Sequence, residues 1–451
     1  MSDKFIEIDR SEPIVLPDNL VEWLNDDDLA IFIVDVVEKL DTRAIENTYK
    51  CGGSKGYPPK MMLGLLFYCY AKGIFSSRKI ERATYELIPV LYIASGLHPD
   101  HDSINTFRKR FLSELGELFV MLLQIAHDMK IFKLGDIYID GTKIKANASK
   151  HKAMSWKYAC ALEKQLKEEV DTLLKHANTQ YSKANKELDI PAEITRREDR
   201  LEKISVVKKE IESRAKARYE QEKIEYDAKI ADREAKEKAR GKKFGGKKPK
   251  EPEEGARDKD QVNFTDEDSR IMPQSGGGFV QAYNAQASVD GKTMLIVAEH
   301  VSQKANDKQE VEPTLDELAK LPETLGHVER AGLDSGYFSA DNVDRLNQKA
   351  IEPFITSGRQ SHNQRLEDRL ADEPQAPEKP TPVEAMQHQM KTKQGKEFYA
   401  KRKSTVEPVF GIIKEIMGFR HFMLRGIEAV KGEWTLMCLA YNLKRLCVLN
   451  S

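Results

Sequence analysis

The stretch Asp136-Ile-Tyr-Ile-Asp140-Gly-Thr-Lys143 places a carboxylate at the end of a short run of β-branched and aromatic residues. The run alternates, so Asp136, Tyr138 and Asp140 are expected on one face and the two isoleucines on the other, which is the pattern of a half-buried strand. Gly141 is expected to end the strand. An acidic residue at a strand end is commonly only a turn former. A catalytic role for Asp140 therefore depends on what the rest of the chain provides.

Length and composition describe a folded protein of several domains. The chain has 451 residues, of which 40% are hydrophobic and 32% are charged, and these values favour two or three globular domains over disorder. Its 72 basic and 73 acidic residues leave a formal charge of -1. Contact with nucleic acid must therefore come from local basic patches, because the overall charge is close to neutral.

Cysteine spacing and hydropathy indicate the compartment. The five cysteines show no Cys-x-x-Cys spacing and no partnering histidines, which argues against a structural zinc site and fits reduced thiols in the cytosol. The first twenty residues are polar and acidic, and the most apolar run, Met61 to Ala71, is too short to cross a bilayer. We expect a cytoplasmic protein without a membrane partner.

Residues 1 to about 130 are expected to form an all-helical domain, because prolines mark helix starts and glycines mark helix ends. Pro58-Pro59 opens an apolar helix, and Ser76 can cap the next helix, Ser77 to about Glu86. A third helix is expected from Ile104 to about Leu112.

The second and third of these helices each carry a basic cluster. One interpretation is a DNA-binding domain of the helix-turn-helix type, whose basic side chains meet phosphates and base edges. The alternative is an ordinary helical domain with solvated basic side chains. The candidate DNA-binding residues are Arg78, Lys79, Arg82, Arg108, Lys109 and Arg110.

From Trp156 to about Arg240 the chain is dominated by charge. Lys, Arg, Asp and Glu make up 27 of the 50 residues from Leu201 to Lys250, so most of this segment must be solvated. Narrow apolar seams repeat every three or four residues on both sides of a break at Asp189-Ile-Pro191. Because neither seam can be buried alone, we expect an antiparallel helical hairpin, followed by a flexible basic linker from Gly241 to Pro252.

Strand patterns return from Gly278 onward. Alternating runs on either side of Asp290-Gly291 predict a β-hairpin. The next strand, His327 to Asp334, again ends in an aspartate, and Ala350 to Thr356 is expected to form an edge strand because it contains a proline. The connecting helices are expected at 311–321 and 337–349.

Helical periodicity returns around Phe398, after a polar, mobile or loosely helical segment at 358–395, and it places Glu407 on a helix. Asp140, Asp334 and Glu407 thus come from two strand ends and a helix, and rigid elements that bring carboxylates together suit divalent cations. With the first strand between the hairpin and the strand of Asp334, the order of elements predicts a ribonuclease-H-like fold in which two Mg2+ ions support phosphoryl transfer. Asp136, on the same strand face as Asp140, is the rival ligand.

The motifs around these acids resemble those of the DDE transposases of bacterial insertion sequences. Asp140-Gly-Thr is similar to the family's first motif, Ala331 to Ser339 to the second, and Thr405 to Lys414 to the third. The chain is also similar to the family's Tyr-Arg-Glu-Lys signature. Four residues separate the arginine from the glutamate where the pattern has three, so Lys403 is the alternative to Arg402. The matching residues are Tyr399, Arg402, Glu407 and Lys414.

The resemblance implies an α+β multidomain protein. It would have an all-helical N-terminal domain and a ribonuclease-H-like mixed α/β catalytic core with a long helical-hairpin insertion. The corresponding boundaries are 1–130 for the helical DNA-binding domain, 131–155 and 263–451 for the core, and 156–262 for the insertion and its linker.

The resemblance also implies a function. Such a transposase binds the ends of its insertion sequence and catalyses DNA strand cleavage and strand transfer with two Mg2+ ions, for which Mn2+ can substitute. Asp140, Asp334 and Glu407 are the implied catalytic residues and metal ligands. Double-stranded DNA, as transposon ends and as target, is the implied partner, and a homodimer or larger assembly on DNA and association with the bacterial nucleoid are expected. The DNA contacts implied near the acids are Lys143, Tyr399, Arg402, Lys403 and Lys414.

Two other functions stay open. A metal-dependent ribonuclease-H-like nuclease would keep the three acids but only hydrolyse its substrate. A non-catalytic DNA-binding or coiled-coil scaffold would account for the basic helices and the hairpin, but not for three acids in register with metal chemistry. Joining of a freed 3′ hydroxyl to a second DNA distinguishes a transposase from a nuclease.

Overall fold

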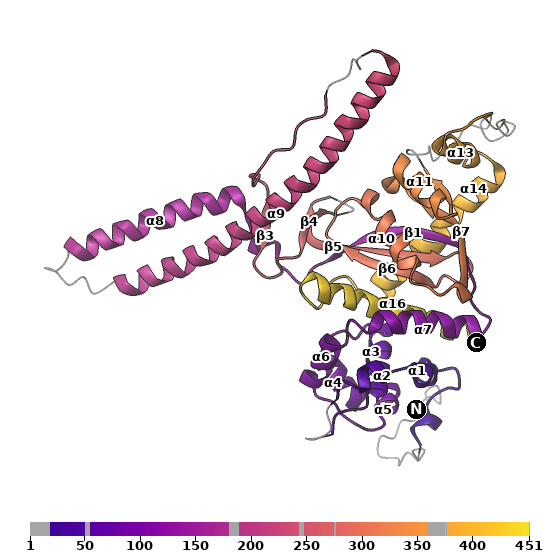
Figure 1. Cartoon of the computed structure of the whole chain (residues 1–451). Coiled ribbons are helices and arrows are strands. Elements are labelled where there is room, and N and C mark those ends of the chain that lie inside the picture. The colour runs from indigo at the N-terminus through magenta and orange to yellow at the C-terminus, as the bar shows by residue number, and fades with distance from the viewer. Residues whose placement is uncertain are drawn as a thin grey trace, which may run out of the picture. The chain divides into compact units, whose positions relative to one another are not determined.

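The computed structural model describes residues 19–49, 55–179, 189–242, 248–274, 277–356, 358, 375 and 377–450. The described residues form two compact units (Figure 1). One comprises the residues up to Lys145 together with those from Tyr283 onward, and the other comprises Ala146–Ala282. The first unit holds the main sheet, the helices that cover it and the N-terminal helices.

The sheet is built around β1 (Leu134–Lys145). On one side lie β7 (Gly326–Leu333) and then β8 (Glu352–Ile355), and these three strands run parallel. On the other side lies β5 (Phe279–Asp290), which pairs antiparallel with β6 (Ile296–Ser302) across the predicted hairpin. The predicted order of strands is confirmed, with β8 at the edge, and it is the ribonuclease-H-like arrangement.

Burial and length of β1 differ from the prediction. Ile137, Tyr138 and Ile139 are all fully buried, because a central parallel strand is covered on both faces and has no solvent side. The predicted half-buried strand is therefore wrong. Gly141 does not end the strand either, since β1 continues to Lys145, and a glycine inside a strand often marks a close approach of another group to the backbone.

Helices cover the sheet and complete its core. α10 (Val311–Leu318) packs on β6, α11 (Ala340–Gln348) on β8 and α15 (Arg402–Gly411) on β1. The last helix, α16 (Ile427–Asn450), also packs on β6. Its Asn442 amide accepts a hydrogen bond from the Ile296 N–H and donates one to the Ile296 carbonyl. One buried side chain thus satisfies both backbone groups of a strand residue.

The N-terminal part is helical, as predicted. α3 (Pro59–Ala71) is buried along most of its length and packs on α1 (Leu29–Lys39) and on α16. α4 (Ser77–Glu86) has its predicted bounds, although the Ser76 side chain makes no capping hydrogen bond. α6 (His101–Arg110) starts earlier than predicted, because Asp100 accepts a hydrogen bond from the Ser103 N–H. The other helices here are α2 (Arg43–Glu46), α5 (Ile88–Ile93) and α7 (Leu115–Asp128).

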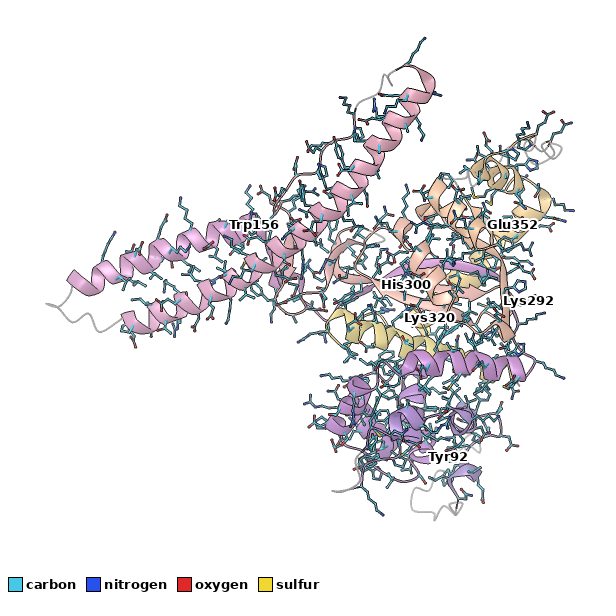
Figure 2. All side chains as sticks on the ribbon, in the orientation of Figure 1. Tyr92, Trp156, Lys292, His300, Lys320 and Glu352 are labelled. Atoms are coloured by element: carbon cyan, nitrogen blue, oxygen red, sulfur yellow. The ribbon has the colours of Figure 1, made fainter. Side chains whose placement is uncertain are left out.

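The second unit contains the predicted helical hairpin. α8 (Trp156–Thr179) and α9 (Ile190–Arg240) pack on each other and run antiparallel (Figure 1). Side chains extend outward along both helices (Figure 2), as their charge requires. At the base of the hairpin β2 (Ala153–Ser155) pairs with β3 (Gln261–Asn263). The hairpin and this ladder share a buried apolar cluster of Met154, Ala159, Leu162, Leu166, Ile204, Val207, Ile211 and Val262.

Two predicted segments lie partly outside the described residues, namely the linker at 241–252 and the polar segment at 358–395. The described part of the latter forms α13 (Pro382–Gln389) and the start of α14 (Lys393–Ala400), and α15 is followed by a π-helical turn, η6 (Ile412–Ile416). No helix in the described part of the chain is long and apolar enough to span a membrane. The remaining elements are β4 (Arg270–Pro273), which pairs with β5, and the 3-10 turns η1 (Leu20–Trp23), η2 (Lys150–Lys152), η3 (Asp307–Gln309), η4 (Glu323–Leu325) and η5 (Ser335–Tyr337).

Candidate active site

Strand register brings the first two acids together. β1 and β7 are parallel neighbours, and Ile139 pairs with Leu333. The next residues along the two strands, Asp140 and Asp334, therefore lie next to each other at the same end of the sheet. Asp334 also caps the turn η5, since its Oδ1 accepts a hydrogen bond from the Gly336 N–H at 2.8 Å.

Glu407 reaches the same place from α15, the helix that packs on β1. The Arg402 guanidinium links it to the strand end. Its Nη1 donates to Asp140 Oδ2 at 3.3 Å, and its Nη2 donates to Glu407 Oε1 at 2.8 Å. The Arg402 side chain is only 12% exposed, against 19% for Asp140 and 46% for Glu407. One buried cation thus bridges two of the three acids.

The Asp140 carboxyl is harder to ionise than an exposed carboxyl, mainly because it is buried. Burial raises its pKa to about 6, Arg402 opposes this rise, and the neighbouring carboxylates of Asp334 and Asp307 add to it. A further cation at this position would favour the ionised carboxylate. Within the described ranges, however, no three side chains of the His, Cys, Asp and Glu types are arranged to hold one metal ion.

Lys414 lies in the π-helical turn that follows α15, and π turns inside helices often occur at functional sites. Its ammonium group donates a hydrogen bond to the Thr142 hydroxyl, two residues beyond Asp140. Burial lowers the pKa of Lys414, although Asp140 and Glu415 act in the opposite direction. A second basic side chain is therefore held near the first acid.

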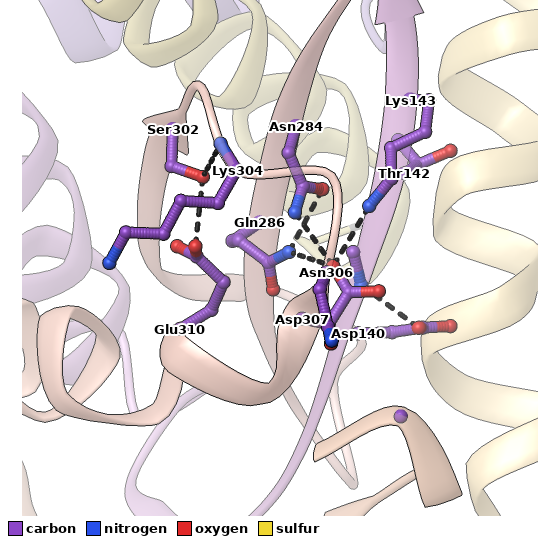
Figure 3. A network of polar contacts seen from close by, with 12 residues as sticks. Asp140, Thr142, Lys143, Asn284, Gln286, Ser302, Lys304, Asn306, Asp307 and Glu310 are labelled. Carbon is purple, nitrogen blue, oxygen red and sulfur yellow. Dashed lines mark hydrogen bonds and ion pairs between the residues drawn. The ribbon is translucent and has the colours of Figure 1, made fainter. Parts of the chain in front are cut away.

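A group of polar side chains around the Asp307 carboxylate lies near Asp140 (Figure 3). Asp307 accepts hydrogen bonds from Lys143, Asn284 and Gln286, and the Tyr337 hydroxyl donates to Gln286. Sequence reasoning did not find these residues, apart from Lys143. The signal was present in β5, where the amides Asn284 and Gln286 occupy alternate positions with Ala285 between them.

The glycine of the first motif is required by this polar group. A Cβ on Gly141 would lie 2.0 Å from Gln286 Nε2 and 2.9 Å from Asp307 Oδ1, distances that no side chain can accept. Gly332 on β7 has a similar reason, since its Cβ would lie 2.6 Å from the Tyr138 ring. Both motif glycines therefore serve close packing inside the strands.

The comparisons with known proteins agree with this geometry. Residues 246–443 match the family described as the transposase DDE domain, and residues 18–110 match a family described as a transposase domain. The chain belongs to the DDE-type transposases. Members of this family generally act with divalent metal ions. No curated protein and no solved structure gave a match to the chain.

The other predicted residues near the acids of this transposase take different positions. Tyr399 shares a hydrogen bond with the Thr356 hydroxyl at 3.1 Å. Lys403 is exposed, whereas Arg402 contacts two acids, so the geometry favours Arg402 over Lys403 as the arginine of the signature. The rival ligand Asp136 is instead paired with Arg330, which donates to both carboxylate oxygens at 2.7 and 2.5 Å.

Arg108 is not a DNA-binding residue, and this prediction is wrong. Its side chain is buried, and its Nη1 donates to the Tyr70 hydroxyl and to the Phe75 carbonyl, each at 2.9 Å. The Tyr70 hydroxyl in turn donates to the buried carboxylate of Glu433 on α16 at 3.0 Å. The guanidinium thus compensates a buried carboxylate of the transposase core and is not available to phosphate.

The five other basic residues of the N-terminal helices that were predicted to bind DNA are exposed. Arg78, Lys79 and Arg82 lie on α4, and Lys109 and Arg110 lie on α6, which packs against α4. Arg82 pairs with Glu86 at 2.6 Å, and Arg110 donates to the Thr48 carbonyl. These side chains form the exposed basic surface of the N-terminal helices.

Proposed function

We propose that this transposase binds the ends of its insertion sequence and cleaves and joins DNA strands at Asp140, Asp334 and Glu407. The observation that carries the proposal is the meeting of three carboxylates from separate rigid elements, two of them bridged by a single guanidinium. Carboxylates gathered in this way repel one another unless cations are present. Two-metal phosphoryl transfer uses such a set of hard oxygen ligands.

The three acids supply carboxylate oxygens, which are the ligands that divalent metal ions prefer, although Arg402 lies between Asp140 and Glu407 and the described side chains are not arranged around one ion. Asp140, Asp334 and Glu407 would hold two Mg2+ ions, or Mn2+ in their place, and the ions would stabilise the attacking and leaving oxygens of the phosphoryl group. Arg402 bridges Asp140 and Glu407, and it would give up these contacts if the acids held metal ions. Its guanidinium would then be able to pair with a DNA phosphate. Arg402 would thus neutralise the acids without metal and bind DNA with it.

Several side chains near the acids are suited to hold the DNA end. Lys143 lies on β1 and Lys414 contacts Thr142 of the same strand, and both are partly buried. Tyr399 lies on α14, and Lys403 lies on α15, the helix that carries Glu407. We assign them to phosphate and base contacts at the cleavage site, and we assign the exposed basic residues of α4 and α6 to recognition of the end sequence.

A strand-transfer assay tests this function. The purified chain is incubated with Mg2+, a labelled duplex that ends in the terminal sequence of its insertion element, and a supercoiled target plasmid. We expect 3′ ends that become joined covalently to the plasmid. Free 3′ hydroxyls without joined product would identify a nuclease. No cleavage of end DNA in Mg2+ or Mn2+ would contradict catalysis and leave the scaffold function.

The basic surface of α4 and α6 should give end binding a steep dependence on salt. Each lost phosphate contact lowers the slope of log K against log salt concentration by about 0.9. Arg82→Ala in the full-length chain is expected to lower the slope by about this amount, as measured by fluorescence anisotropy. Arg43→Ala on α2 is a matched control, because both arginines are exposed and each pairs with one nearby carboxylate. Equal slopes for the two variants would contradict the assignment of α4.

The helical hairpin is proposed to act in assembly. Its apolar seam is buried between α8, α9 and the β2–β3 ladder, so the charged outer faces of the two helices are suited to contact DNA or a second protomer. We propose that two or more protomers assemble on paired transposon ends. The boundaries predicted from the sequence for the helical domain, the core and the insertion remain part of this proposal.

A further inference from the structure

Asp307 gathers hydrogen bonds from two strands at a single oxygen. Its Oδ1 accepts from Lys143 Nζ at 3.0 Å, from Asn284 Nδ2 at 2.7 Å and from Gln286 Nε2 at 2.9 Å. Lys143 lies on β1, and the two amides lie on β5 (Figure 3). A carboxylate oxygen with three donors is fixed in position, and it fixes the donors as well.

Gln286 connects Asp307 to the turn that carries the second aspartate. Its Oε1 accepts a hydrogen bond from the Tyr337 hydroxyl, and its backbone carbonyl accepts one from Trp434 Nε1 at 3.0 Å. Both Gln286 and Tyr337 are fully buried. Tyr337 is the last residue of η5, whose N-cap is Asp334. The Gln286 side chain therefore spans the distance between Asp307 and the Asp334 turn.

The backbone of Gly141, directly after Asp140, packs against the side chains of Gln286 and Asp307. Gly141 approaches Gln286 and Asp307 so closely that no Cβ fits between them. Neither the Asp140 nor the Asp334 carboxylate forms a hydrogen bond with Asp307, Gln286 or Tyr337 in the described part of the chain. These polar side chains thus contact the chain next to Asp140 and next to Asp334. Among the described residues, they make no hydrogen bond with the two carboxylates, which remain able to bind cations.

Polar side chains in the middle of a central strand are costly unless every group is paired. Asn284 and Gln286 are buried on β5, and only Ala285 lies between them. Apolar side chains at these two positions would pack the sheet without this cost. The two amides are therefore better explained by a role in positioning the neighbouring strands than by a contribution to stability alone.

We infer that Asp307, Gln286 and Tyr337 are positioning residues. They hold the part of β1 that carries Asp140 and the turn that carries Asp334 at the separation at which the two carboxylates can bind divalent cations together. This inference rests on the proposed function, because it takes the two aspartates as metal ligands. Removing such a supporting contact typically weakens metal binding by about 10- to 100-fold.

Tyr337→Phe tests the inference with the smallest change. It removes the hydroxyl that donates to Gln286 and keeps the ring that fills the core. We expect Mn2+ binding by the full-length protein, measured by isothermal titration calorimetry without DNA, to weaken by about 10- to 100-fold. End-DNA binding in EDTA should be unchanged.

Tyr441→Phe is the matched control. Tyr441 is also a buried tyrosine of the same unit, and its hydroxyl donates to the Met294 carbonyl at 3.1 Å. Both variants lose one buried hydrogen bond, so both should lower the melting temperature. Only Tyr337→Phe should weaken Mn2+ binding. Equal Mn2+ affinities for the two variants would show that the Tyr337 hydroxyl is merely structural and would overturn the inference.

A second variant tests the network as a unit. Asp307→Asn keeps an oxygen that accepts hydrogen bonds and removes the charge. Asp307→Asn and Tyr337→Phe are expected to be non-additive in Mn2+ affinity, because either change releases the same link between the two strand ends. Strict additivity would overturn the inference. So would a fall in the number of bound Mn2+ ions in Asp307→Asn alone, which would make Asp307 a ligand.

Wild-type protein and Asp140→Ala separate this inference from the proposed function. If the wild type binds no Mn2+, or if Asp140→Ala binds it as the wild type does, the metal function itself fails and the inference falls with it. If Asp140→Ala alone loses binding while Tyr337→Phe and Asp307→Asn retain it, only the positioning inference is overturned.

Discussion

Replacing Asp140 by alanine is expected to lower the rate of DNA strand cleavage by about 1,000-fold or more, while binding of end DNA persists. A metal ion supplies several kcal/mol of transition-state stabilisation, and each 1.36 kcal/mol is a factor of ten in rate. The basic residues of α4 and α6 do not depend on this carboxylate. Single-turnover cleavage of a labelled end in Mg2+ and anisotropy of the same duplex measure the two quantities.

Asp136→Ala is the control for this experiment. Asp136 lies on the same strand as Asp140 and is also a partly buried carboxylate paired with an arginine, but its partner Arg330 lies away from the three acids. We expect this variant to lose some stability and to keep cleaving DNA. Normal Mg2+-dependent cleavage by Asp140→Ala, or loss of cleavage only in Asp136→Ala, would contradict the assignment of Asp140 as a catalytic residue.

Replacing residues 158–255 with a short Gly/Ser linker is expected to leave a folded protein that binds Mn2+ but does not pair two transposon ends. The change removes most of α8 and all of α9, and it retains β2 and β3. Gel shifts with one end and with two differently labelled ends measure single-end binding and pairing. The expected outcome is a single-end complex without the paired complex.

The deletion variant would expose apolar side chains of the β2–β3 ladder that the helices cover. Met154 and Val262 belong to the apolar cluster of the hairpin, so both are replaced by threonine, which suits a solvated strand. The same two substitutions in the full-length chain serve as the control for the ladder itself. A deletion variant that unfolds would show that the hairpin is part of the core. One that pairs ends and transposes normally would show that it is dispensable.

The sequence was sufficient for the strand order, because the relevant signals were local. An Asp-Gly turn between alternating runs identified the hairpin of β5 and β6, and the two strand patterns with an aspartate after them identified β1 and β7, although Asp140 lies inside β1. The burial of Tyr138 on a central strand was not predictable in this way. It depends on Phe398, whose ring lies 5.0 Å from that of Tyr138 and which comes from a distant helix.

Charge was harder to interpret than hydrophobic pattern. Arg108 and its neighbours Lys109 and Arg110 look alike in sequence, yet only Arg108 is buried. Glu433, the carboxylate to which the Tyr70 hydroxyl connects it, is more than 300 residues away in the sequence. Asp307 was missed for the same reason, since its donors come from β1 and β5. A buried ionic side chain is explained by partners that folding alone brings together.

The packing of α3 on α16 has a consequence for biosynthesis. α3 spans Pro59–Ala71, whereas α16 spans Ile427–Asn450 and is therefore synthesised much later. A ribosome-bound chain that still lacks α16 exposes the apolar surface of α3 that α16 covers, and its Tyr70 lacks the Glu433 carboxylate. The N-terminal helices should therefore complete their fold only after α16 has been synthesised, so a chain without α16 should not yet bind DNA ends.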